Sequence, residues 1–136
     1  MQPEGFNPMR WDCQRDGCFN VKRRPKIEVF AECFPRRINF GDVDGLVELN
    51  GWFILLEWKG SGGSLPQGQV MSFERFTRDI GDLVLVVHGD AEIMTVTGYS
   101  EFWGGRHTPI VQADLALVKS RIRRWVDWTE AAKVAA

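Results

Sequence analysis

The sequence predicts an α/β fold in which helices flank a mixed β-sheet. Three observations point to it: short apolar runs of strand length, an Asn-Gly dipeptide typical of a tight hairpin turn, and segments with apolar residues at helical spacing. In chain order these segments give a helix, two or three antiparallel strands, a helix, two strands and a final helix. The chain has 136 residues and is 44% hydrophobic, which suits one domain with a substantial core.

The first predicted helix covers residues 25–34. Glu28 and Glu32 are four residues apart and should share one flank of this helix. Residues 1–24 are expected to form an N-terminal arm, and residues 25–136 a single domain. The apolar residues of the helix recur at helical spacing and should pack on the core: Ile27, Phe30, Ala31 and Phe34.

Residues 44–59 are predicted to form a β-hairpin. Asn50-Gly51 lies between two apolar segments, which is the strongest short-range hairpin signal. A turn centred there places Asp44 opposite Glu57 across the ladder. Side chains two residues apart on a strand point to the same face, so Lys59 should share that face with Glu57.

Charged side chains are unusual in such a hairpin, because aspartate and lysine are depleted from strands and charges are rarely buried unless paired. Two carboxylates about 5 Å apart repel by about 3 kcal/mol at an effective dielectric of 20, and a cation would relieve this repulsion. Hard oxygen ligands suit Mg²⁺ or Mn²⁺. The alternative is a carboxylate pair offset by a salt bridge to Lys59 at the rim of the sheet.

Val43-Asp44, Glu57-Trp58-Lys59 and Gln67-Gly68-Gln69 together resemble the PD-(D/E)XK nucleases, particularly the small resolvase-like and virus-type replication and repair nucleases of phages and mobile elements. The resemblance spans roughly residues 25–88. It implies a restriction-endonuclease-like α-β-β-β-α-β core with a mixed central sheet, to which this chain adds a C-terminal helix.

The resemblance also implies the roles of individual residues. Val43 stands where the family often has proline, and Asp42 offers a second candidate carboxylate beside Asp44. Glu32 is the alternative to Glu28 as the glutamate contributed by the first helix. The resemblance implies that five residues are catalytic and that the three acidic ones hold the metal: Asp44, Glu57, Lys59, Gln69 and Glu28.

The activity that these features predict is that of a Mg²⁺- or Mn²⁺-dependent DNA endonuclease. The chain is too short for a separate target-recognition domain, which favours branched or structured DNA over a long specific sequence. Small members of the family commonly dimerise, so a homodimer is expected. The alternative is a non-catalytic protein that keeps the nuclease fold and binds nucleic acid or a protein partner.

The glycine-rich segment 60–64 either lets a nucleic-acid backbone approach or is a flexible connection. A helix should begin near Pro66, with Val70, Phe73 and Phe76 on its core stripe. Residues 82–89 are predicted to form a strand buried on both faces, and residues 91–99 a strand with one exposed face. Residues 101–108 should form an exposed loop or hairpin tip, and residues 113–132 a helix.

The formal net charge is only −1, so the distribution of basic residues matters more than their number. One basic cluster surrounds the first helix, where we expect DNA contact, and another lies on the last helix, where a solvated face is favoured over DNA contact. The two clusters are Lys22, Arg23, Arg24, Lys26, Arg36 and Arg37, and Lys119, Arg121, Arg123 and Arg124.

The cysteines Cys13, Cys18 and Cys33 are odd in number, which fits a reducing compartment. Structural Zn²⁺ needs four ligands, and His88 and His107 lack motif spacing with the cysteines, so the sequence does not predict a zinc site. His88 ends a buried strand and is expected to be packed or hydrogen-bonded. Without a membrane-spanning apolar stretch or a signal-peptide region, a cytoplasmic protein is expected.

Overall fold

The computed structural model describes residues 26–38, 40–41 and 43–135. The chain divides into two compact units, Met1–Asp42 and Val43–Ala136, and each is described by itself. The arm predicted over residues 1–24 lies outside the described residues.

The first unit contains a 3₁₀ helix, η1 (Ile27–Cys33), where an α-helix was predicted. None of its residues is buried, so the predicted core face is not formed. The spacing that predicted it requires 3.6 residues per turn, whereas a 3₁₀ helix has three. Instead, the ring centroids of Phe30 and Phe34 lie 6.0 and 5.4 Å from the ring centroid of Phe40, and both contacts are edge-to-face.

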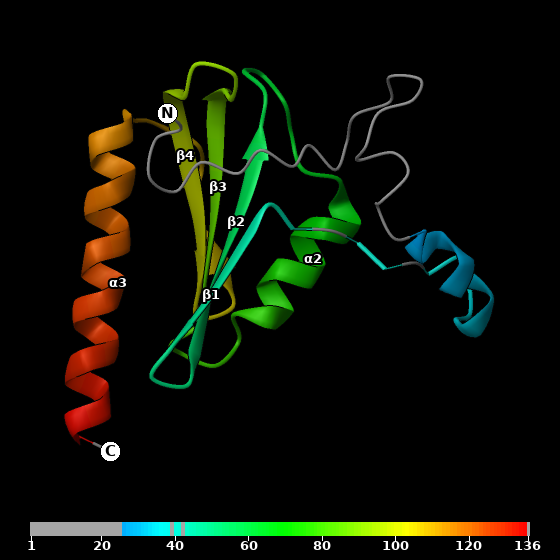
Figure 1. Ribbon diagram of the computed structural model, residues 1–136, viewed down its shortest axis with the longest axis horizontal. Helices are drawn as coiled ribbons and strands as arrows, with labels where there is room; N and C mark the ends of the chain where they lie inside the picture. The colour runs from blue at the N-terminus through cyan, green and yellow to red at the C-terminus, as the bar shows by residue number, and fades with distance from the viewer. Residues whose placement is uncertain (1–25, 39, 42, 136) are drawn as a thin grey trace, which may run out of the picture. The chain divides into compact units, whose positions relative to one another are not determined.

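The second unit is an α/β structure built on a mixed sheet (Figure 1). The strands follow the order β1-β2-β3-β4-β5, and β6 also pairs with β4. β2 and β3 are parallel, whereas the other pairs are antiparallel. The described residues form two strands before α2, where the resemblance implied three. The elements are β1 (Gly45–Leu49), β2 (Trp52–Lys59), α2 (Gln67–Phe76), β3 (Leu83–Asp90), β4 (Thr95–Trp103), β5 (Arg106–His107), β6 (Val111–Gln112) and α3 (Leu115–Ala135).

The β1–β2 hairpin has the predicted register. Leu49 pairs with Trp52, and the two turn residues, Asn50 and Gly51, have φ values of 56° and 93°. Two consecutive positive φ angles are what a type I′ turn requires, and Asn-Gly adopts them with little strain. This turn sets which residues of β2 face each side of the sheet.

The two helices cover opposite faces of the sheet, as Figure 1 shows. α3 packs on the larger core through Val118, Trp125 and neighbouring apolar residues, as its sequence periodicity predicted. α2 packs on the other face through Phe73 and Val70. Phe76 was expected on the same stripe, but it is the last residue of the helix and is 37% exposed.

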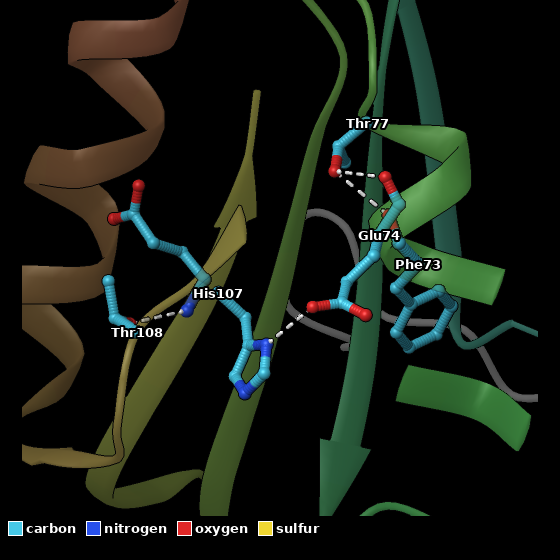
Figure 2. A network of polar contacts seen from close by, with 6 residues as sticks. Phe73, Glu74, Thr77, His107 and Thr108 are labelled. Atoms are coloured by element: carbon cyan, nitrogen blue, oxygen red, sulfur yellow. Dashed lines mark hydrogen bonds and ion pairs between the residues drawn. The ribbon is translucent and has the colours of Figure 1, made fainter. Parts of the chain in front are cut away.

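The C-terminal half of α2 contacts β5 and the turn that precedes it (Figure 2). His107 Nδ1 lies 3.1 Å from Glu74 Oε2, and the backbone N–H of Gly105 donates to the carbonyl of Thr77 at 2.9 Å. The Thr77 hydroxyl in turn donates to the carbonyl of Phe73. These contacts fix α2, and with it the start of the helix, against one face of the sheet.

Two predictions in the second half of the chain need correction. Residues 91–94 form a turn, and β4 begins at Thr95 and continues to Trp103. Phe102, expected in an exposed loop, is therefore a central core residue that is 1% exposed. The hairpin tip lies at Gly104 and Gly105, both with positive φ. Within the described ranges, no helix has the length and apolar character needed to cross a membrane.

Candidate functional site

A group of polar residues meets where β2 ends and α2 begins. Glu57 and Lys59 lie on β2, with Lys59 Nζ 3.4 Å from Glu57 Oε1. Gln69, in the first turn of α2, forms a side-chain hydrogen bond with Glu57. Trp58 lies between Glu57 and Lys59 in the sequence, but its side chain packs in the core on the α3 face, as strand parity predicted. Glu57, Lys59 and Gln69 therefore meet on the face that α2 covers, which we call the α2 face.

Asp44 joins this group from the other strand of the hairpin. The β1–β2 ladder ends at the pair Gly45 and Leu56, and the Asp44 N–H continues it by donating to the carbonyl of Leu56 at 3.0 Å. Asp44 Oδ2 accepts a hydrogen bond of 2.6 Å from the backbone N–H of Trp58. This bond fixes the carboxylate at the end of the hairpin, close enough to Glu57 to act on its charge.

The environment of Glu57 opposes its ionisation. The residue is only 9% exposed, and burial, followed by the negative charge of Asp44, raises its pKa above the ordinary value. The hydrogen bond from Gln69 and the charge and hydrogen bond of Lys59 act in the opposite direction without cancelling the effect. The site thus holds two carboxylates, Asp44 and Glu57, and one ammonium, that of Lys59, which leaves excess negative charge at a buried position.

The glycine-rich segment after β2 forms a compact turn beside this group. Gly63 N–H donates to the carbonyl of Gly60 at 2.9 Å, and Gly62 has a φ of 80°. No side chain of Gly60 or Gly62 stands over the end of β2, since glycine has none. The places where side chains of Gly60 and Gly62 would stand are open space.

The chain matches no protein-family model, no curated protein and no solved structure. Its function is therefore inferred from the arrangement of Asp44, Glu57, Lys59 and Gln69, together with the resemblance of their motifs to the PD-(D/E)XK nucleases.

The other predicted site residues belong to the first unit or lie outside the described residues. Glu28 and Glu32 are both exposed on η1 in the first unit, whereas the other predicted ligands, Asp44 and Glu57, belong to the second. Asp42, the alternative to Asp44, lies outside the described residues. Of the predicted DNA-binding residues, Lys26, Arg36 and Arg37 are exposed in the first unit, and Arg23 and Arg24 fall outside the description.

Arg121 lies neither on a solvated face of the last helix nor on a DNA-binding one, so both interpretations of the basic cluster are wrong for this residue. It is 9% exposed, and its Nε and Nη2 donate to the two carboxylate oxygens of Glu101 at 2.8 and 3.0 Å. The sequence carried no signal for this pair, because Glu101 was assigned to a loop. Its position on β4 opposite Leu85, a residue of the core under α3, turns its side chain toward α3.

The donor set suits a hard divalent cation. Mg²⁺ is usually held by one or two carboxylates and completes its shell with water and substrate phosphate oxygens. Asp44 and Glu57 supply two such carboxylates, and burial together with the charge of Asp44 raises the pKa of Glu57, which a bound cation would oppose. Across the described ranges no group of three or more His, Cys, Asp or Glu residues is placed to hold a metal ion.

The histidines and the described cysteine do not assemble into a zinc site. Cys33 is an exposed free thiol of the first unit, and His107 pairs with Glu74 on α2. Cys13 and Cys18 lie outside the described residues. His88 is 5% exposed on β3, which agrees with the predicted packing of this side chain.

Replacing Glu57 with glutamine is expected to change how stability depends on pH. The raised pKa means that the folded protein binds this proton more tightly than the unfolded chain, whose pKa is near 4.5. Relative to the variant, wild type should therefore lose stability as the pH rises from about 4.5 through the folded-state pKa. Urea denaturation between about pH 4 and pH 8 measures the difference.

A suitable control for this measurement is Glu130→Gln, which alters an exposed glutamate of α3 paired with Lys133. This variant should follow the pH dependence of wild type. Identical pH dependence of Glu57→Gln and wild type would contradict the electrostatic description of the site.

Proposed function

We propose that this protein is a metal-dependent DNA endonuclease that hydrolyses phosphodiester bonds in branched or otherwise structured DNA. The observation that carries the proposal is the contact of buried Glu57 with Lys59 and Gln69, next to Asp44. Glu57 and Lys59 come from β2, Gln69 from α2 and Asp44 from the residue just before β1, and they are the four residues of the proposed nuclease motif that lie in the second unit.

Asp44 and Glu57 would hold Mg²⁺ or Mn²⁺. The bound ion would act as a Lewis acid on the scissile phosphate and lower the pKa of a coordinated water. Asp44 is held in place by the Trp58 N–H, and Glu57 by Gln69, so both carboxylates are oriented before substrate binds. Such preorganisation avoids a reorganisation cost during the reaction.

Lys59 supplies the positive charge of the site. Its ammonium lies beside Glu57, in a position to donate to the attacking water or to a non-bridging phosphate oxygen. Negative charge builds up on those oxygens as the water attacks phosphorus, and a fixed cation stabilises it more in a partly buried site than in water. The side chain of Lys59 is 23% exposed, so substrate can reach it while its stem stays packed.

DNA is the proposed partner, and a homodimer is proposed because two sites would address the two strands of a branched substrate. Light scattering of the protein with and without a four-way junction measures the number of protein chains in the particle. A strict monomer in both conditions would contradict the dimer and leave the proposed chemistry standing.

The proposed activity predicts metal-dependent cleavage of supercoiled plasmid, linear duplex, single strand or a four-way junction, with the junction cut fastest. Mg²⁺ or Mn²⁺ should support cleavage, and EDTA should abolish it. Asp44→Asn is the matched variant, because the amide oxygen can still accept the bond from the Trp58 N–H while the charge is lost. It should fold as wild type does and fail to cut. Metal-independent DNA binding without cleavage of any substrate would instead favour a non-catalytic binding protein.

A further inference from the structure

His88 lies next to Lys59 in the sheet. β2 and β3 are parallel, and in their register Lys59 is paired with His88, just as Glu57 is paired with Val86. Val86 belongs to the core on the α2 face, and His88 follows it by two residues on the same strand. Because the side chains of a strand alternate, His88 points to the same face as Val86, Glu57 and Lys59.

The imidazole of His88 is buried without a polar partner. The residue is 5% exposed, and in the part of the chain that the structure describes neither ring nitrogen forms a hydrogen bond or ion pair. The backbone carbonyl of His88, by contrast, accepts a bond from the Thr97 hydroxyl. A neutral imidazole carries one donor and one acceptor, and a buried polar group without a partner is unfavourable. An aliphatic side chain would fill this position without that penalty.

The strand opposite His88 places no side chain against its ring. Its partner on β4 is Gly98, which has no side chain, and the register shifts immediately after this pair, where Gly89 aligns with Val96. Such bulges re-aim side chains and are common beside active sites. A side chain at position 98 would collide with the carbonyl oxygen of Val111, at 2.9 Å, and with the side chain of Ile110, at 3.2 Å, so only glycine fits opposite His88.

The ammonium of Lys59 needs a second partner if Glu57 binds a cation. Its contact is with Glu57 Oε1 at 3.4 Å, and Glu57 is one of the two carboxylates that would hold the metal. An ammonium has three donors, and His88 is the paired neighbour of Lys59 on β3, on the same face and with an unused acceptor. We propose that His88 is a positioning residue of the site, whose imidazole accepts a hydrogen bond from Lys59 Nζ when the carboxylates bind a cation. This inference rests on the proposed nuclease function and deepens it.

Three variants of His88 test the role. His88→Leu removes the acceptor and keeps an apolar side chain, whereas Asn and Gln place an amide oxygen near the position of one or the other ring nitrogen. We expect His88→Leu to lower kcat for DNA cleavage by about 10- to 100-fold with KM unchanged, because a misplaced catalytic group slows the reaction by such factors. One of the two amide variants should restore most of kcat.

Val84→Ala is the control for a purely structural effect. It lies on the same strand and the same face as His88, in the core and away from the site. It should lower stability and leave kcat unchanged below its melting temperature. If His88→Leu cuts DNA at the rate of wild type, the role of His88 is overturned and the nuclease function stands.

A spectroscopic readout separates this inference from the activity. The chain has two histidines, so ¹⁵N spectra of the imidazoles are simple to assign with His88→Leu. Addition of Mg²⁺ should shift the His88 ring nitrogens in wild type and leave them unchanged in Lys59→Met. If wild type fails to cut any DNA but shows this shift, the nuclease function falls and the contact between Lys59 and His88 stands. No shift in wild type would overturn the contact.

Discussion

Replacing Lys59 with alanine is expected to lower the rate of metal-dependent DNA cleavage by at least about 100-fold, because the site loses its fixed positive charge. Lys59 is the cation that contacts Glu57, and its side chain is partly accessible to substrate. The fold should persist, since Lys59 is the last residue of β2 and lies outside both hydrophobic cores. Single-turnover cleavage of a junction measures the rate, and circular dichroism checks the fold.

Two further variants make this result specific. Lys59→Met keeps the apolar stem and removes the charge, so it should be as inactive as Lys59→Ala. Lys133→Ala removes a lysine whose side chain is 57% exposed and paired with Glu130 on α3, and it should cut at the wild-type rate. Full activity of Lys59→Met would show that the charge is not needed and would refute the proposed chemistry.

Glu101→Ala is expected to destabilise the fold by about 3–5 kcal/mol, because it leaves the buried charge of Arg121 without its partner. The two residues form a bidentate pair with bonds of 2.8 and 3.0 Å, and their side chains are only 10% and 16% exposed. The guanidinium also lies 5.8 Å from the ring centroid of Trp103, which packs against the same core. Urea denaturation measures the loss.

The double variant Glu101→Leu/Arg121→Leu separates the pair itself from the penalty of an unpaired charge. Replacing a buried ion pair with apolar residues is often nearly neutral, so the double variant should be more stable than Glu101→Ala. A loss below about 1 kcal/mol for Glu101→Ala would contradict the burial of this pair, since exposed pairs contribute at that level.

The β1–β2 hairpin shows what local sequence signals can predict. Asn50 and Gly51 adopt the two positive φ angles of their turn, and the turn alone sets the register through which Asp44 approaches Glu57. Parity along β2 then predicts that Lys59 joins Glu57. All three steps depend on residues close in the chain, and the structure confirms them.

The first helix shows where the same reasoning fails. Its apolar spacing predicted an amphipathic α-helix, but Ile27–Cys33 is a 3₁₀ helix without buried residues. Short helices have little intrinsic stability in water and form according to the surface available for packing. The pattern in the sequence could not show that Phe30 and Phe34 would contact Phe40 instead.

The sequence by itself determined the order of the elements, the hairpin and the grouping of Asp44, Glu57 and Lys59, because turns and strand parity depend on neighbours in the chain. Only the tertiary structure decided the burial that raises the pKa of Glu57, the hydrogen bond from Gln69 and the place of His88 beside Lys59. These features depend on the parallel pairing of β2 with β3 and on the packing of α2. Both bring together residues distant in sequence, whose contacts leave no local signal.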